Sequence, residues 1–196
     1  MVNSEVDIVL LHGAGAGHGS AFLLQLAREL SAFAAVEPLT LAYMQEMEAS
    51  GRRRPPPRFE RLQEELQARL DQRARSCWLV GKSMGGRLAM ALRPHPRVCG
   101  AVALGYPLHP PGKKQQLRLP PLQCSAKPGL ILQGQRDPFG QPQEFVALAL
   151  PSQVQLQGVE GADHDWRTPV GGMSLAALLR QASLDIATFI KNTDTK

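Results

Sequence analysis

The sequence predicts an α/β fold built on a mainly parallel, six-stranded sheet with helices on both faces. Short apolar runs rich in β-branched residues alternate with longer segments in which apolar residues recur every three to four positions. This alternation implies parallel strands, because each parallel connection needs a crossover that a helix supplies. The chain has 196 residues, 43% of them hydrophobic and 20% charged, which suits one globular core. We therefore expect a single domain over residues 1–196.

The first half of the chain predicts three strands and two amphipathic helices. The strands are the apolar, β-rich runs Val6–His12, Val36–Ala42 and Cys77–Gly81. Helical spacing marks the helices, through Phe22, Leu26 and Leu30 after a Gly-Ser start, and through Leu62, Leu66 and Leu70. The stretch Met44–Arg58 shows neither period and receives no assignment.

The second half predicts three more strands and three helices. The strands are Val98–Leu104, Gly129–Gln133 and Val154–Gln157. The helices are Met84–Arg93, which Pro94 stops, then Gln143–Leu150, and a C-terminal one marked by Leu175, Leu178, Leu179, Ala182, Ile186, Phe189 and Ile190. The proline-rich stretch Pro107–Pro128 receives no assignment. Both unassigned stretches follow a strand, so we expect them at the carboxyl edge of the sheet, where open α/β folds bind ligands.

Composition argues against several classes of function. The 22 basic residues against 17 acidic ones give a net charge of +5, but with only 5% aromatic residues we expect no nucleic-acid partner. No apolar run reaches the roughly 18 residues of a membrane span, so we expect no membrane partner. Met1–Asp7 has no basic segment of the kind that opens a signal peptide, which predicts a cytoplasmic protein. Cys77, Cys99 and Cys124 are too widely spaced for a metal or redox pair, so we expect buried free thiols and no metal site.

A serine framed by glycines gives the first indication of chemistry. Gly81-Lys82-Ser83-Met84-Gly85 has the pattern G-x-S-x-G, directly after a predicted strand and directly before a short predicted helix. A nucleophile elbow requires this context, because strand and helix meet so tightly that side chains two residues to either side of the serine would clash. A Walker A loop is excluded, because Ser76 stands where that motif needs its first glycine.

An acid and a histidine follow the serine in suitable places. A serine hydroxyl needs a base to take its proton, and the base needs a carboxylate to orient it. Asp137 lies just beyond the predicted strand Gly129–Gln133, and His164 lies just beyond the last predicted strand. Because the carboxyl ends of parallel strands meet at one edge of the sheet, we expect Ser83, Asp137 and His164 to come together.

The first strand runs into the glycine-rich segment His12–Gly17, where a second oxyanion donor is expected. The backbone N–H groups of Ala14 and Met84 would hold the oxyanion, and His12 would tie the loop through hydrogen bonds. One alternative is a turn that simply uses glycine. Another is a dinucleotide-binding fingerprint, which His18 disfavours because it occupies the position of the third glycine.

Substrate contacts are predicted from charge and from the position of the unassigned loops. Arg52, Arg53, Arg54 and Lys113 follow strands that should flank the serine strand, so they would favour an anionic acyl substrate. His109 is a further candidate for substrate contact. The alternative for the arginines, and for Lys82 beside the serine, is a solvated charge without a role.

The motifs resemble those of a known superfamily. The order of Gly-Lys-Ser-Met-Gly-Gly, Leu-Gln-Gly-Gln-Arg-Asp-Pro-Phe-Gly and Gly-Ala-Asp-His resembles the α/β-hydrolase superfamily, in its dienelactone-hydrolase-like branch. More narrowly, His-Gly-Ala-Gly-Ala, the Arg-Pro segment at Gly51–Pro56 and the segment Gly105–Lys113 resemble a bacterial group of hydrolase-like proteins. That group is related to a testis-expressed protein and to a subunit of the non-specific-lethal chromatin complex. The chromatin-complex subunit resembles a scaffold protein.

The resemblance covers nearly the whole chain and implies Ser83 as nucleophile, Asp137 as acid and His164 as base. It implies the minimal α/β-hydrolase fold with strand order 2-1-3-4-5-6, since nothing is long enough for a separate cap domain. The expected function is a serine hydrolase that cleaves a small ester, thioester or related acyl bond through an acyl-Ser83 intermediate, without metal or cofactor. The alternative is a catalytically silent binding or scaffold protein of the same fold.

Overall fold

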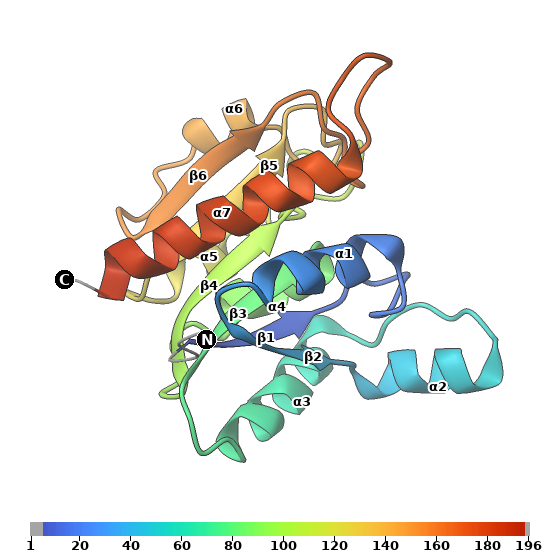
Figure 1. Cartoon of the computed structure of the whole chain (residues 1–196), viewed down its shortest axis with the longest axis vertical. Coiled ribbons are helices and arrows are strands. Elements are labelled where there is room, and N and C mark those ends of the chain that lie inside the picture. The colour runs from blue at the N-terminus through green and yellow to red at the C-terminus, as the bar shows by residue number, and fades with distance from the viewer. Residues whose placement is uncertain (1–5, 195–196) are drawn as a thin grey trace.

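One parallel sheet organises the chain. The computed structural model describes residues 6–194, so Met1–Glu5, on which the expectation about a signal peptide mainly rests, lie outside the described residues. All neighbouring strands pair in parallel, in the order β2-β1-β3-β4-β5-β6, which confirms the predicted order (Figure 1). The strands are β1 Asp7–Leu11, β2 Ala35–Leu39, β3 Cys77–Lys82, β4 Val98–Leu104, β5 Gly129–Gly134 and β6 Val154–Val159. The helices are α1 Ala21–Leu30, α2 Ala42–Ser50, α3 Phe59–Asp71, α4 Met84–Ala91, α5 Pro120–Gln123, α6 Pro142–Val146 and α7 Leu175–Asp194.

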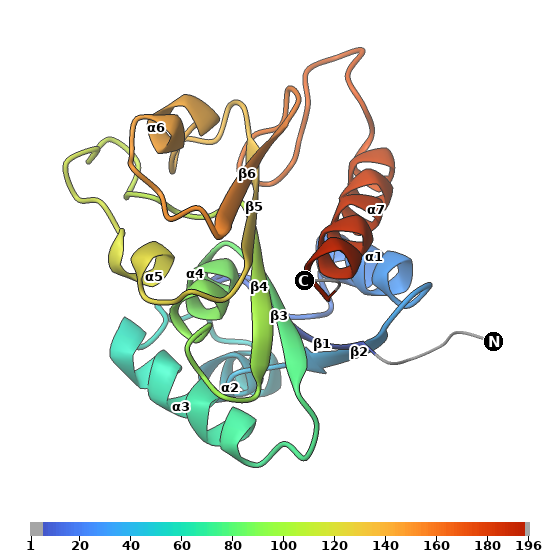
Figure 2. The same cartoon turned by 90° about the vertical axis from the view of Figure 1, so that its left-hand side faces the viewer.

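Helices cover both faces of the sheet. Seen edge-on, α1 and α7 lie on one face and α3 to α6 on the other (Figure 2). Side chains alternate between the two layers: Ile8 and Leu10 of β1 join the cluster under α1 and α7, whereas Val9 and Leu11 join the cluster under α3 and α4. Because both faces are buried, the central strands appear in the sequence as continuous apolar runs.

The unassigned stretch Met44–Arg58 is partly helical. Helix α2 occupies Ala42–Ser50 and ends at Gly51, whose φ of 66° is a left-handed conformation that favours glycine. Only Tyr43 and Met44 of this helix are buried, because α2 projects beyond the carboxyl end of β2 (Figure 1). With so few inward positions the helix has little apolar period, which explains why the sequence does not reveal it.

Other boundaries differ more modestly from the prediction. Pro107–Pro128 contains the short helix α5, which has proline at its first positions. Helix α6 ends at Val146, earlier than the predicted Gln143–Leu150. Strand β2 ends at Leu39, while β6 continues to Val159.

All three cysteines are free, and the burial predicted for them is correct for one residue and wrong for two. Cys77 is buried, whereas Cys99 and Cys124 are exposed. Cys99 is the extra residue of a bulge, since Cys77 pairs with Val98 and Trp78 pairs with Gly100. A bulge turns its extra residue out of the strand's regular alternation, and no local pattern in the sequence marks it.

Among residues 6–194, no helix combines the length and the apolar character that crossing a membrane requires.

The close packing of Gly100, next to the bulge, against Trp78 predicts an effect on stability. A Cβ placed on Gly100 would lie 2.3 Å from Cζ3 of the buried Trp78 ring, so we expect Gly100→Ala to destabilise the protein. Forced overpacking of this kind typically costs about 1–3 kcal/mol. The free energy of unfolding from urea titration measures the effect. Gly19→Ala is the control, because a Cβ there meets nothing within 4 Å. Equal stability of the two variants would contradict the prediction.

Candidate active site

Ser83 lies on a strained turn between β3 and α4. Its φ of 52° and ψ of −113° belong to a conformation that residues with a side chain rarely adopt. Two backbone bonds hold the turn: the Ser83 N–H donates to the Leu104 carbonyl at 2.9 Å, and the Arg87 N–H donates to the Ser83 carbonyl at 3.0 Å. The strain presents the hydroxyl at the carboxyl edge of the sheet, as a nucleophile elbow does.

The glycines around Ser83 are required by close packing. A Cβ on Gly81 would lie 2.2 Å from the carbonyl carbon of Gly85, and a Cβ on Gly85 would lie 2.6 Å from the His12 carbonyl oxygen. A Cβ on Gly86 would lie 2.8 Å from the Ala103 Cβ. The clash that the sequence pattern predicts for side chains at these positions is therefore confirmed.

The structure brings Ser83, His164 and Asp137 into one hydrogen-bonded line. His164 Nε2 lies 2.8 Å from Ser83 Oγ, and His164 Nδ1 lies 2.8 Å from Asp137 Oδ2. Since the carboxylate only accepts, Nδ1 carries the proton, and Nε2 is left to accept the serine hydroxyl proton. The three residues follow β3, β6 and β5, so the parallel topology places them at the same edge, toward the right of Figure 1.

Asp137 is held in a polar, buried environment. Its side chain is 1% exposed, and Oδ1 accepts the Phe139 backbone N–H at 2.8 Å. Gln133, the buried polar residue near the end of β5, donates Nε2 to Asp137 Oδ2 at 3.0 Å and to the Gly140 carbonyl at 2.7 Å. The sequence pattern does not mark Gln133 as a site residue. A glutamine at the end of an apolar run is nevertheless unusual and is the signal that could have indicated its role.

The loop that carries His164 is shaped by its neighbours. Asp163 Oδ1 accepts the backbone N–H groups of Asp165 and Arg167, both at 2.9 Å. Trp166 is fully buried with a left-handed φ of 61°. The Phe139 ring lies 4.2 Å from the His164 ring between centroids. Together these contacts leave the imidazole little freedom to turn away from Ser83.

Gly105 is another site residue that the sequence analysis does not single out. It follows β4 with a φ of 67°, and a Cβ there would lie 3.4 Å from both Asp137 Oδ2 and His164 Nδ1. A side chain in this backbone conformation would be strained and would press on the hydrogen bond between the two residues. Glycine keeps that space open.

The glycine-rich loop after β1 lies beside the elbow. A Cβ on Gly13 would lie 3.9 Å from the Ser83 Cβ, so the predicted oxyanion donors, Ala14 and Met84, lie on segments that adjoin Ser83. Tyr43 of α2 donates its hydroxyl to the Ala14 carbonyl at 3.2 Å. Burial raises the pKa of Tyr43 to about 12, so the phenol stays protonated as a donor.

His12 ties this loop to the next element, in the structural role expected from the sequence. Nε2 accepts the Leu41 backbone N–H at 3.1 Å, so Nδ1 donates to the Gly13 carbonyl at 2.7 Å. His18 is half-buried and bonds to the Leu10 carbonyl at 2.9 Å and to Thr40 Oγ1 at 3.0 Å. The glycine-rich loop is thus held by polar contacts at both ends.

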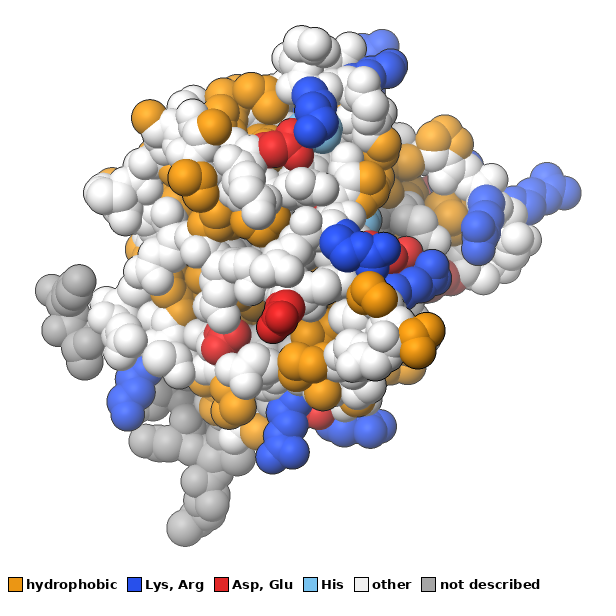
Figure 3. Space-filling view, turned by 90° about the horizontal axis from the view of Figure 1, so that it is seen from above, with side chains coloured by type: hydrophobic (Ala, Val, Ile, Leu, Met, Phe, Trp, Pro, Cys, Tyr) orange, Lys and Arg blue, Asp and Glu red, His pale blue; other side chains and the backbone are white. Residues whose placement is uncertain are grey.

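The prediction that the basic substrate-binding residues follow strands flanking the serine strand is wrong for Arg52–Arg54, because β2 pairs with β1 and not with β3. Arg52, Arg53, Arg54 and Lys113 are exposed, and Arg54 pairs with Glu46 on α2. Within the described residues no hydrogen bond or ion pair joins these four to the Ser83, His164 and Asp137 line. Lys and Arg side chains seen from above occupy several separate places rather than one patch (Figure 3).

Two polar residues are more buried than charged or ring side chains usually are. His109 is 1% exposed, and its ring nitrogens bond to Glu144 Oε2 at 3.1 Å and to the Pro110 carbonyl at 2.9 Å; its contact with substrate stays a prediction. Lys82 is no solvated charge: its side chain is buried at the elbow and bonds to the His164 loop. Across residues 6–194, no cluster of His, Cys, Asp and Glu side chains could hold a metal ion.

The fold and this serine, histidine and aspartate line are those of a hydrolase-type α/β protein. A model of the alpha/beta hydrolase domain family matches residues 4–191, so the chain belongs to that family, and the predicted six-stranded parallel sheet with helices on both faces is confirmed. No curated protein matches the chain in sequence.

Several solved structures share the fold. They include the esterase Est1E from Butyrivibrio proteoclasticus with ferulic acid bound, at 13% identity and a TM-score of 0.68 over 96% of this chain and 90% of that one. An alpha-beta serine hydrolase homologue from Coxiella burnetii has 16% identity and a TM-score of 0.69, over 96% and 86%. A dienelactone hydrolase from Anabaena variabilis has 20% identity and a TM-score of 0.63, over 95% and 88%. At these identities the likeness establishes the fold, and with the family it supports hydrolase activity.

The buried His12 generates a prediction about pH. Burial is the main reason that the pKa of His12 lies below its ordinary value of 6.5, and burial also lowers the pKa of His18. The unfolded chain therefore binds more protons than the folded one, and we expect stability to fall as pH drops through about 6.5.

Urea unfolding between pH 8 and pH 5 measures this dependence. Because His18 contributes in the same direction, His12→Gln should flatten the slope without abolishing it. A variant with the wild-type slope would show that His12 does not titrate in this way.

Proposed function

We propose that the protein is a serine hydrolase that cleaves a small ester, thioester or related acyl bond through an acyl-Ser83 intermediate. The observation that carries the proposal is the continuous line from Ser83 Oγ through His164 to Asp137, with 2.8 Å at both hydrogen bonds. A nucleophile, a base and an orienting acid at these distances are what acyl transfer to serine needs.

The proposed reaction starts when Ser83 Oγ attacks the acyl carbonyl carbon while its proton passes to His164 Nε2. Asp137 stabilises the imidazolium that forms, and the backbone N–H groups of Ala14 and Met84 donate hydrogen bonds to the negatively charged tetrahedral oxygen. The imidazolium then gives its proton to the departing alkoxide or thiolate, which leaves acyl-Ser83. Water, activated by the same imidazole, hydrolyses the acyl-enzyme and restores the serine. The chain's own side chains supply every proton transfer, so the proposal involves no cofactor.

The finer features of this function stay predictions. An anionic substrate held by Arg52–Arg54, His109 or Lys113 has weaker support than the acyl chemistry itself, because Arg54 is paired with Glu46 and His109 is buried. The cytoplasmic location, and the narrower resemblance to the group related to a testis-expressed protein and a chromatin-complex subunit, also stay predictions.

Labelling with a fluorophosphonate tests the nucleophile. We expect the reagent to modify Ser83 alone, because among the serines of residues 6–194 only the elbow serine has a histidine base at 2.8 Å together with proposed oxyanion donors nearby. Mass spectrometry of the digested protein identifies the modified residue. Labelling that persists in Ser83→Ala would sink the proposal, and an unlabelled wild-type protein would favour the catalytically silent alternative.

Substitutions of two neighbouring acids test the assignment of Asp137. Asp137→Asn should lower kcat for a small ester by about 10⁴-fold, since the imidazole loses the carboxylate that sets its tautomer. Asp163→Asn is the matched control: it lies beside His164, but its side chain bonds only to backbone N–H groups of its own loop. We expect a much smaller loss there, and an equal loss would mean that the acid is misassigned.

A further inference from the structure

Lys82 is a buried cation inside the elbow itself. It ends β3 and precedes Ser83 in the chain, yet its residue is only 8% exposed. Burying an ammonium group costs several kcal/mol unless polar partners compensate. An apolar side chain at this position would avoid that penalty, so the charge calls for an explanation other than stability.

The ammonium group reaches the loop that carries His164. Lys82 Nζ donates to the His164 backbone carbonyl at 2.5 Å, a hydrogen bond between residues 82 positions apart. Among the described residues no carboxylate oxygen lies within 4.0 Å of Lys82 Nζ, the distance at which a salt bridge would form. The His164 carbonyl is therefore the main polar contact of the ammonium group. The lysine therefore connects the residue beside the serine directly to the residue that carries the imidazole.

Two aromatic rings link Lys82 to the same loop. Lys82 Nζ lies 5.3 Å from the centre of the Phe22 ring of α1. Phe22 in turn packs edge-on against Trp166, at 5.4 Å between ring centroids. Trp166 lies two residues beyond His164 and is fully buried. Lys82, Phe22 and Trp166 thus form a chain of contacts that leads back to the loop that carries His164.

We propose that Lys82 is a positioning residue, which holds the His164 loop at hydrogen-bond distance from Ser83. The inference rests on the proposed function. It follows from sequence adjacency: any displacement of the elbow carries Lys82 with it, and the bond from Nζ to the His164 carbonyl draws the histidine loop along.

The other charges around Lys82 are acidic and lie on the loops after β5 and β6. Burial is the main cause that lowers the pKa of Lys82, and Asp165, Asp137 and Asp163 oppose that shift. From α1, the element packed against the other side, the contact is the uncharged Phe22 ring. Substituting Lys82 leaves these acids and the Phe22 ring in place, so a change in kcat or in hydrogen exchange of the histidine loop reports the loss of the lysine itself.

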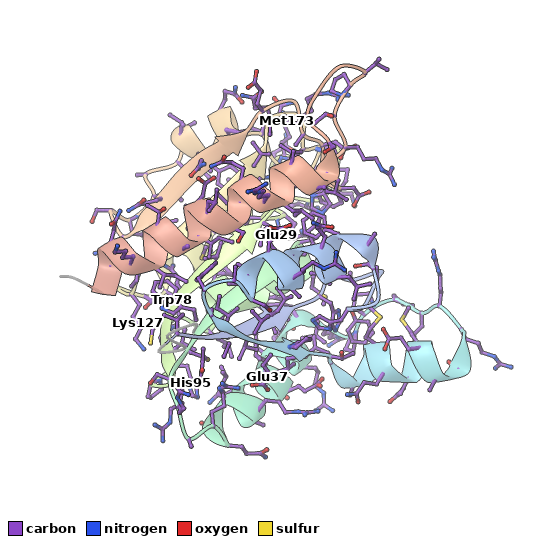
Figure 4. All side chains as sticks on the ribbon, in the orientation of Figure 1. Glu29, Glu37, Trp78, His95, Lys127 and Met173 are labelled. Atoms are coloured by element: carbon purple, nitrogen blue, oxygen red, sulfur yellow. The ribbon has the colours of Figure 1, made fainter. Side chains whose placement is uncertain are left out.

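The test compares Lys82→Met with Lys127→Met. Lys127 is a matched control, because its Nζ also donates to two backbone carbonyls, those of His95 and Val98, both at 2.6 Å. Figure 4 labels Lys127 and His95 at the amino-terminal side of the sheet, away from Ser83. Losing either lysine removes buried carbonyl contacts, but only Lys82 lies at the site.

We expect Lys82→Met to lower kcat for a small ester by about 10- to 100-fold while KM changes little, because the base is displaced and substrate binding is not. Hydrogen exchange at the amides of residues 161–168 should accelerate, and labelling of Ser83 by the fluorophosphonate should slow. Lys127→Met should lose stability but keep the wild-type kcat, the wild-type labelling rate and the wild-type exchange in that loop.

Unchanged kcat and exchange in Lys82→Met would overturn the inference, as would the same changes in Lys127→Met. Should Lys82→Met fail to fold, Lys82→Gln is the second variant, because its shorter neutral amide tolerates the polar surroundings, and it should lower kcat with little change in KM in the same way. Fluorophosphonate labelling separates the two proposals. An unlabelled wild-type protein refutes the serine hydrolase, whereas a labelled wild type with equally fast labelling of Lys82→Met refutes the role of Lys82 alone.

Discussion

The site depends on the close approach of β3 and α4 around Ser83. The two elements meet with no side chain at Gly81 or Gly85, where a Cβ would lie 2.2 Å and 2.6 Å from backbone atoms. This contact forces the serine into a left-handed conformation and directs its hydroxyl out of the sheet. Such strain persists only where surrounding structure holds it, and the buried strands on either side of β3 provide that support.

The parallel sheet converts this local geometry into a site. Because all six strands run in the same direction, the segments that follow β1, β3, β5 and β6 end at one edge, although they are far apart in the sequence. Four of the buried polar residues, His12, Lys82, Gln133 and Asp137, lie at this edge. Each bonds to a neighbouring loop or belongs to the network of Ser83, His164 and Asp137, so the polar groups that are expensive to bury are concentrated where chemistry is proposed.

Support for the histidine comes from two independent directions. Asp137, Gln133 and Phe139 approach it from the loop after β5, and Lys82, Phe22 and Trp166 approach it from the other side. The first group sets the tautomer of the imidazole, and the second sets the position of its backbone. Precise placement needs both, because a side chain on a loop is only as well oriented as the backbone that carries it.

The sequence by itself determined the parallel sheet, the strand order implied by its resemblance, and the meeting of Ser83, Asp137 and His164. Those features leave local marks: strands buried on both faces read as continuous apolar runs, and the elbow requires glycine at fixed spacing. Only the tertiary structure decided that Lys82 is buried, that His109 faces Glu144 and that Cys99 forms a bulge. It also decided that α2 exists, since just two of its residues are buried. Each of these features depends on a contact with a residue many positions away, or on how much of an edge element other elements cover. The spacing of apolar residues within one segment does not reveal either.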